Sequence, residues 1–117
     1  MSKFETLRIW QESRQIVNEI YAIFKSSNDF SFKDQIQRAS ISIINNIAEG
    51  CESGTDNLNI RYLQIAKGSC AEVKSMLYLS EDFEICSHSK AEELREKLNF
   101  VISGIHKMIH YLKDQKK

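Results

Sequence analysis

The stretch QIQRASISIINNIAEG, residues 35–50, decides the fold because it reads as one helix with two incompatible faces. At about 100° per residue, its polar side chains gather into a narrow stripe, whereas its apolar side chains cover an arc of roughly 200°, about twice the width that a surface helix buries. A single core cannot cover this arc. We therefore expect the helix to be central in its own domain or to pack against another copy of the chain as well.

Two sets of residues on this helix are candidates for function. The apolar flank beside the core-facing residues is the predicted contact between copies, and it comprises Ile41, Ile44 and Ala48. The polar stripe must find partners, because buried polar groups are normally hydrogen-bonded. It comprises Arg38, Ser42, Asn45, Asn46 and Glu49, with Glu72 as the expected partner of Arg38. We interpret the stripe as a structural network that fixes register, since no second reactive group accompanies an acid as catalysis would require.

Length and charge limit the choice of function. The chain has 117 residues, enough for the single domain that we expect over residues 1–117. Lys and Arg number 16, as do Asp and Glu, so the chain has no net charge to steer it toward polyanions. No apolar run approaches the roughly 18 residues of a membrane span, and the sequence starts without a signal-peptide pattern. Three cysteines without a CxxC pair suit reduced thiols, so we expect a cytoplasmic protein.

Apolar residues repeat at spacings of three and four in four segments, the pattern of amphipathic helices. The chain contains no proline, so nothing interrupts long helices. The four expected buried stripes are Trp10, Ser13, Val17, Ile20 and Phe24; Ile36, Ala39, Ile43 and Ile47; Leu58, Tyr62, Ile65, Ala66, Ser69, Val73, Met76 and Leu77; and Ala91, Leu94, Leu98, Val101, Ile105, Met108 and Leu112.

Capping residues set the expected helix boundaries. The first helix should span roughly residues 4–25, and Ser31 should cap a second helix that ends at Gly50. Thr55, Asp56 and Asn57 offer caps for the third helix, and Ser89 with Glu92 forms a capping box for the fourth. Four helices joined by short polar loops predict an all-α fold, an antiparallel up-down-up-down four-helix bundle.

The histidines near the C-terminus have a spacing that metal ligands can use. His106, His110 and Asp114 follow one another at intervals of one helical turn. However, the two histidines lie about 120° and 160° from the apolar stripe of their helix, on the side expected to face solvent. A phosphate-binding glycine loop and a GxSxG motif are both absent from the sequence. We therefore expect no metal, no cofactor, no small-molecule substrate and no catalytic residues.

Charge is uneven along the chain. Residues 90–117 hold seven bases and four acids, a net charge of +3, while residues 56–84 hold three bases and five acids, a net charge of −2. Candidate nucleic-acid contacts in the basic segment are Lys107, Lys113, Lys116 and Lys117. One chain offers a weak footprint, although a ring of copies would multiply it. The alternative is an ordinary solvated helix end, with cations near the negative end of the helix dipole.

Two motifs carry a resemblance to a known family. They are QIQRASISI at residues 35–43 with NIAEG at 46–50, and YLQIAKGS at residues 62–69 followed by Glu72. The chain resembles bacterial four-helix-bundle proteins of the ribosomal RNA intervening-sequence-encoded type. This resemblance implies a homopentameric barrel of antiparallel bundles, and a related branch comprises the nucleic-acid-linked accessory proteins of diversity-generating retroelements. Gln37 stands where similar sequences often have arginine, which removes positive charge.

These observations lead to one main hypothesis and two alternatives. The main hypothesis is a non-enzymatic protein that self-assembles through the spare apolar surface of its first two helices, to a pentamer, and acts as a scaffold or binding module. The first alternative is a nucleic-acid-binding accessory protein, working with RNA or DNA and a reverse transcriptase through its basic C-terminal surface. The second alternative is an enzyme, which would require a strongly perturbed acid or a bound metal in a pocket.

Overall fold

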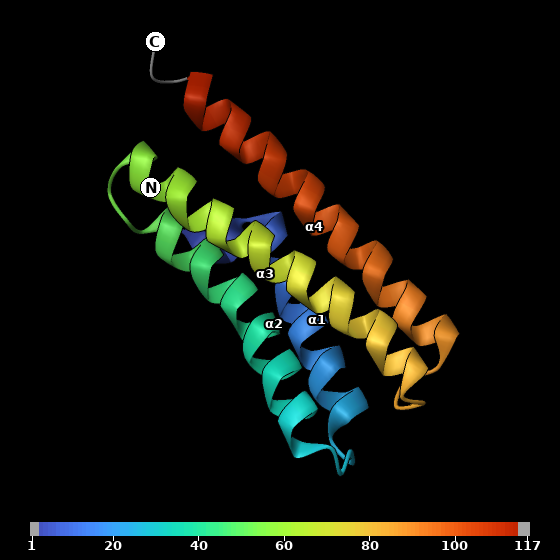
Figure 1. Cartoon of the computed structure of the whole chain (residues 1–117). Coiled ribbons are helices and arrows are strands. Elements are labelled where there is room, and N and C mark those ends of the chain that lie inside the picture. The colour runs from blue at the N-terminus through green and yellow to red at the C-terminus, as the bar shows by residue number, and fades with distance from the viewer. Residues whose placement is uncertain (1–2, 115–117) are drawn as a thin grey trace.

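The computed structural model describes residues 3–114, which form a bundle of four helices (Figure 1). A 3₁₀ turn, η1 (Phe4–Thr6), precedes the helices α1 (Arg8–Phe24), α2 (Phe30–Cys51), α3 (Asp56–Asp82) and α4 (His88–Asp114). Successive helices run antiparallel, and together they make a rod of 49 × 20 × 19 Å. Residues 3–114 contain no strand. The predicted all-α four-helix architecture is confirmed.

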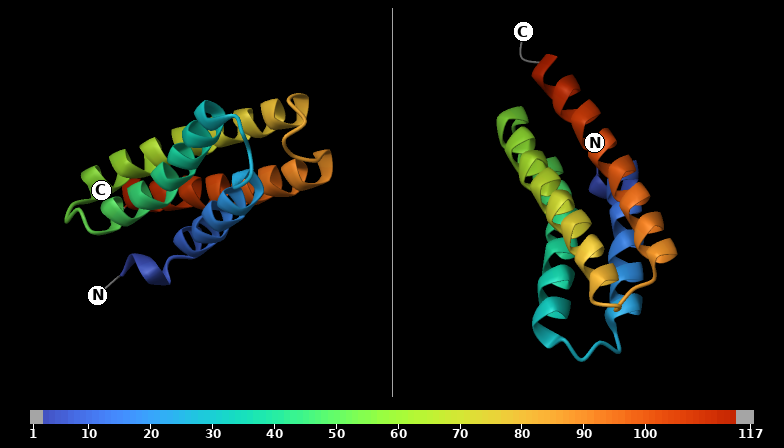
Figure 2. Two further views of the ribbon diagram at one scale, coloured as in Figure 1. Left: turned by 90° about the horizontal axis from the view of Figure 1, so that it is seen from below. Right: turned by 45° about the vertical axis from the view of Figure 1, so that its right-hand side comes forward.

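Each helix contacts two neighbours, in the cyclic order α1, α2, α3, α4 and back to α1. Figure 2 shows this arrangement from two further directions. The helix pairs on the diagonals, α1 with α3 and α2 with α4, make no close backbone contact. Because the number of helices is even, the two ends of the described chain lie at the same end of the rod as the turn between α2 and α3.

The observed caps differ from the expected ones at two of three helix starts. Helix α2 begins earlier than predicted, because the carboxylate of Asp29, not the hydroxyl of Ser31, accepts a hydrogen bond from the N–H of Phe32. Helix α4 is capped by Ser87, whose Oγ accepts from the N–H of Lys90, so the proposed Ser89 capping box is wrong. Thr55 caps α3 as expected, by accepting from the N–H of Leu58.

The core is a continuous apolar column along the rod axis. Ser13, Ile20 and Phe24 of the predicted α1 stripe are buried, whereas Trp10 and Val17 are half-buried. The predicted core face of α2 is buried throughout. The α4 prediction is nearly complete, with Ile109 replacing Met108 as the buried residue.

Glycines allow the helices to approach closely at two points. A Cβ on Gly104 of α4 would overlap Cγ2 of Ile9, so α1 presses directly on the α4 backbone there. A Cβ on Gly50 of α2 would lie 2.7 Å from Asn59 Oδ1 and 3.0 Å from Tyr62 Cβ of α3. Within residues 3–114, no helix is both long enough and apolar enough to cross a membrane.

Candidate functional site

The polar stripe of α2 meets α3 at one point near the middle of the rod. The hydroxyls of Ser42 and Ser69 lie 2.8 Å apart, and Asn46 Nδ2 donates to Ser42 Oγ at 3.0 Å and to Ser42 O at 2.7 Å. Both serines are half-buried. Only part of the expected stripe therefore comes together, because Asn45 and Glu49 are exposed.

Arg38 does not pair with Glu72 as predicted. Its side chain is 79% exposed, and its Nε donates to Asp34 Oδ2 at 2.8 Å, one turn earlier on the same helix. Glu72 is exposed on α3. The prediction is wrong within one chain because both residues lie outside the serine contact, where water solvates each charge. The local pair with Asp34 then loses less side-chain entropy than an ion pair between two helices would.

The predicted buried stripe of α3 has the correct helical spacing, but the buried face of the helix is centred on other residues than predicted. Leu58 and Ile65 were expected to be buried, yet they are 43% and 46% exposed. The buried side of α3 is instead centred on Leu63 and Cys70, which are both fully buried. The difference arises because the apolar arc of α3 is wider than the core, so an apolar strip remains outside.

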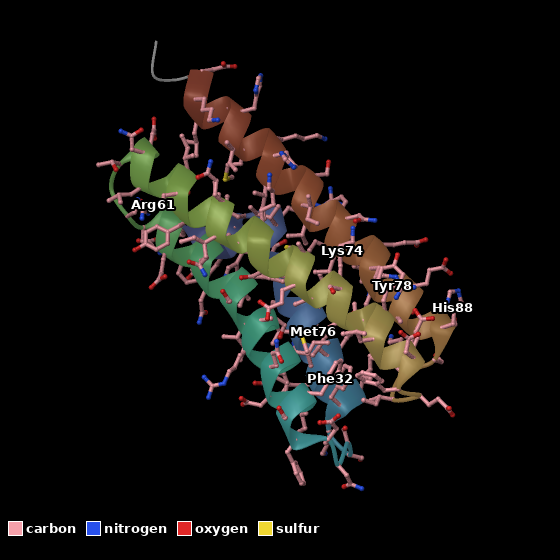
Figure 3. All side chains as sticks on the ribbon, in the orientation of Figure 1. Phe32, Arg61, Lys74, Met76, Tyr78 and His88 are labelled. Atoms are coloured by element: carbon pink, nitrogen blue, oxygen red, sulfur yellow. The ribbon has the colours of Figure 1, made fainter. Side chains whose placement is uncertain are left out.

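This strip is part of what we name the α3 outer surface. At 100° per residue its members fall within about 80° of one another on the outward side of the helix. All are exposed, and they are Leu58, Arg61, Ile65, Gly68, Glu72 and Leu79. Figure 3 shows Arg61 near the start of α3. The three apolar members of this surface, Leu58, Ile65 and Leu79, line one side of α3 at intervals of two and four turns.

A second apolar area lies between α1 and α2, and we name it the α1–α2 surface. Its α2 members are the predicted interface residues Ile41, Ile44 and Ala48, which are all half-buried. They share the side of α2 on which Gln37 lies, and Gln37 lines a groove of about 520 Å³ with Tyr21 of α1. Tyr21 is 40% exposed. The exposed base Arg14 belongs to the same side of α1.

The side of the bundle between α1 and α4 is held by charges that the sequence did not predict. Glu19 of α1 accepts from Lys90 Nζ at 2.9 Å and from Lys97 Nζ at 2.6 Å, joining α1 to α4. Burial acts to raise the pKa of Glu19, but the hydrogen bonds from the two lysines outweigh it, so the pKa is lowered. The same hydrogen bonds raise the pKa of each lysine.

A second charged cluster joins α3 to the start of α4. Arg95 is buried, its Nη1 lies 2.6 Å from Glu81 Oε2, and its guanidinium stacks 3.9 Å from the ring centre of Tyr78. His88 Nδ1 lies 2.7 Å from the other oxygen of Glu81. Figure 3 shows Tyr78 and His88 at this end of α3 and α4. The hydrogen bonds with His88 and Arg95 lower the pKa of Glu81.

Of the remaining candidate residues, His110 and Asp114 approach each other one turn apart on α4, with His110 Nε2 3.9 Å from Asp114 Oδ2. His106 and His110 are exposed on α4, and residues 3–114 bring no three His, Cys, Asp or Glu side chains together as a metal site would require. Burial raises the pKa of Cys70 to about 12, which keeps its thiol protonated and unreactive. Lys107 and Lys113 are exposed, whereas Lys116 and Lys117 lie outside the described residues.

Comparisons with known proteins agree with the fold. Residues 5–109 match a family described as 23S rRNA-intervening sequence protein. The chain is also similar to a crystal structure from Bacteroides thetaiotaomicron VPI-5482, described as a protein with unknown function from the S23 ribosomal protein family. The TM-score is 0.80 at 21% sequence identity, over 86% of this chain and 97% of that one, and this likeness concerns the fold. No curated protein matches the chain.

Proposed function

Because this chain belongs to the 23S rRNA-intervening sequence protein family, we propose that it is a non-enzymatic, self-assembling protein of the cytoplasm. Copies of the bundle form a closed ring, with five members as the sequence resemblance implies, and the ring serves as a scaffold or binding module. The observation that carries this proposal is the presence of two separate apolar surfaces on one small bundle. A lone chain leaves both of them in contact with water.

The two surfaces differ from each other, which favours a head-to-tail ring over a two-fold dimer. The α3 outer surface presents Leu58, Ile65 and Leu79, each more than 40% exposed. The α1–α2 surface presents Ile41 and Ile44 beside a groove. When one surface of each copy packs on the other surface of the next copy, every copy covers both.

The directions of the two surfaces suit a small ring. In a bundle of roughly square cross-section, the side between α1 and α2 and the outward side of α3 point about 90° to 135° apart. If the helices run along the ring axis, two contact directions of this kind close a ring of about four to eight copies, and five copies require about 108°. The pentamer lies within this range.

The experiment compares the mass of the wild-type chain with that of Ile41→Asp by size-exclusion chromatography with light scattering. We expect a mass of several chains for the wild type and of one chain for the variant, with unchanged helical circular dichroism, because Ile41 lies outside the core. Tyr111→Asp is the control, since Tyr111 is 61% exposed on α4 and is a member of neither surface. A wild-type protein that stays monomeric at high concentration contradicts the proposal.

A second candidate function is nucleic-acid binding, which the exposure of Lys107 and Lys113 on α4 favours. In a ring these bases repeat once per copy, so weak single contacts add up. The test is a mobility shift with RNA and with DNA at low and at moderate salt. Binding that weakens steeply with salt supports this function, whereas no binding at low salt, or binding that salt leaves unchanged, contradicts it.

A further inference from the structure

Three of the four glycines have a reason inside the chain. Gly50 and Gly104 lie where a neighbouring helix leaves no room for a Cβ, and Gly54 adopts φ = 92° in the turn before α3, a conformation that favours glycine. Gly68 has none of these reasons. It lies in the middle of α3 with helical backbone, and a Cβ added there would meet no atom within 4 Å.

A glycine in the middle of an exposed helix weakens that helix. No contact within the described chain compensates for this loss of helix stability at Gly68. The space above its backbone is therefore available to another molecule. Gly68 belongs to the α3 outer surface, where it lies between Ile65 and Glu72, one turn away from each. The site is thus a shallow gap bordered by an exposed apolar side chain and an exposed carboxylate.

Two contacts define which residues lie at the level of this gap along the rod. The Ser42–Ser69 contact places residues 41–44 of α2 level with residues 67–70 of the antiparallel α3. Phe24 of α1 packs on Phe32 of α2 with ring centres 5.9 Å apart. Arg14 precedes Phe24 by ten residues, as Ser42 follows Phe32 by ten, so Arg14 lies at this same level.

Rotation about a ring axis parallel to the helices keeps every residue at its level. The level of Gly68 in one copy is therefore the level of Ile41, Ile44 and Arg14 in the next copy. These three residues belong to the α1–α2 surface and supply what the gap lacks, namely two branched apolar side chains and one cation. The apolar side chains match the bare backbone at Gly68, and the cation matches the charge of Glu72.

Resting on the self-assembly proposed above, we propose that Gly68 is the docking point for a second copy of this chain. Ile41 and Ile44 of the next copy pack on the exposed backbone around Gly68, and Arg14 of that copy faces Glu72. A side chain at position 68 would hold the two helices apart, which explains why a helix-weakening residue stands there.

The first experiment compares the masses of Gly68→Leu and Ala71→Leu by light scattering. Ala71 is exposed on the same helix but lies outside the α3 outer surface. Leucine favours the helix at both positions, so we expect both variants to fold. We expect Ala71→Leu to keep the wild-type assembled mass and Gly68→Leu to fall to the mass of one chain. An assembled wild type with an equally assembled Gly68→Leu overturns this inference alone, whereas a monomeric wild type overturns the proposed function as well.

The second experiment mixes two single-chain variants, Gly68→Leu and Ile41→Asp, at high concentration. The first variant keeps an intact α1–α2 surface and the second keeps an intact α3 outer surface, so one intact contact remains between them. We expect a complex of two chains from the mixture and from neither variant alone. A mixture that stays monomeric overturns the inference, because it places the two residues on one self-facing contact, such as α3 against α3.

A charge exchange tests the polar part of the contact. We expect Arg14→Glu to shift assembly to concentrations at least tenfold higher, since it places two carboxylates opposite each other. The double variant Arg14→Glu, Glu72→Arg should restore assembly because it reverses both partners. Restoration supports the pairing, and a double variant as weak as the single one contradicts it.

Discussion

The contact between α1 and α4 and the α3 outer surface differ in how the space beside a glycine is used. Both contain a glycine in the middle of a long helix. At Gly104 the space is filled by Ile9 of α1, and further along the same two helices Lys97 donates a hydrogen bond of 2.6 Å to Glu19. At Gly68 the space is empty and the neighbouring apolar side chains are exposed. The difference teaches that one side is completed by the chain itself, whereas the other side stays open in a single chain, and this open side is where we propose that a copy docks.

The largest expected effect on stability comes from adding a side chain at Gly104, where Ile9 already fills the space. Gly104→Leu should lower the free energy of unfolding by about 3 kcal/mol, because its side chain would overlap Ile9 and force α1 away from α4. Urea unfolding followed by circular dichroism measures the loss. Gly68→Ala is the matched change at the open glycine and should leave the single chain equally stable or up to about 1 kcal/mol more stable. Equal stability of Gly104→Leu and wild type would break the comparison.

The next effect concerns the charges on the two sides. Arg95→Ala should cost about 3 kcal/mol, because the buried guanidinium pairs with Glu81 and stacks on Tyr78. Arg38→Ala should lower the free energy of unfolding by less than about 1 kcal/mol, since the Arg38 side chain is 79% exposed and pairs only with Asp34 on the same helix. Thermal and urea unfolding of both variants check the contrast. Similar losses for the two arginines would show that burial does not separate the two sides.

A smaller effect should come from the serine contact between α2 and α3. Ser42→Ala, Ser69→Ala and the double variant form a cycle that isolates the 2.8 Å hydrogen bond between the hydroxyls. We expect a coupling of about 1 kcal/mol in urea unfolding, the usual value of a partly buried hydrogen bond. A coupling near zero would mean that Asn46 alone satisfies Ser42, since its amide also donates to that hydroxyl.

The smallest effect is the pH dependence of the Glu19 contacts. The folded-state pKa of Glu19 is lowered, so its carboxylate stabilises the fold at neutral pH, and this contribution disappears as the pH falls through the unfolded value of about 4.3 toward the folded one. The pKa of Lys97 is raised, so its contribution is lost only as the pH rises above about 10.4. Urea unfolding between pH 7 and pH 3 should show a shallower decline for Glu19→Gln. An identical decline would remove Glu19 from the acid response.

Periodicity in the sequence predicts the architecture because the spacing of three and four residues defines the buried side of a helix almost directly. It succeeds for α2, whose predicted core face is buried throughout, and nearly as well for α4, where only Met108 differs. It fails for α3, where Leu58 and Ile65 continue the rhythm but lie beyond the edge of the core. Rhythm alone does not show where a wide arc is cut off, because the neighbouring helices determine the centre of burial.

The charged contacts were harder to predict for a different reason. Arg95 follows Leu94 and lies just beside the apolar stripe of α4, so its sequence position gives only a weak sign that it is buried. Its partner Glu81 is on another helix. Pairing between two helices depends on how far they are shifted along each other and how each is rotated about its axis, which a single sequence does not reveal. Arg38 shows the opposite error, because a local partner, Asp34, lies within reach one turn away.

The even number of helices has one more consequence for a ring of these rods. In cyclic symmetry every copy points the same way, so the ring that we propose is a short tube whose two rims are chemically different. One rim carries the turns between α1 and α2 and between α3 and α4, and the other carries both ends of the described chain. A tag fused to either terminus therefore decorates one mouth of the tube and leaves the opposite mouth bare.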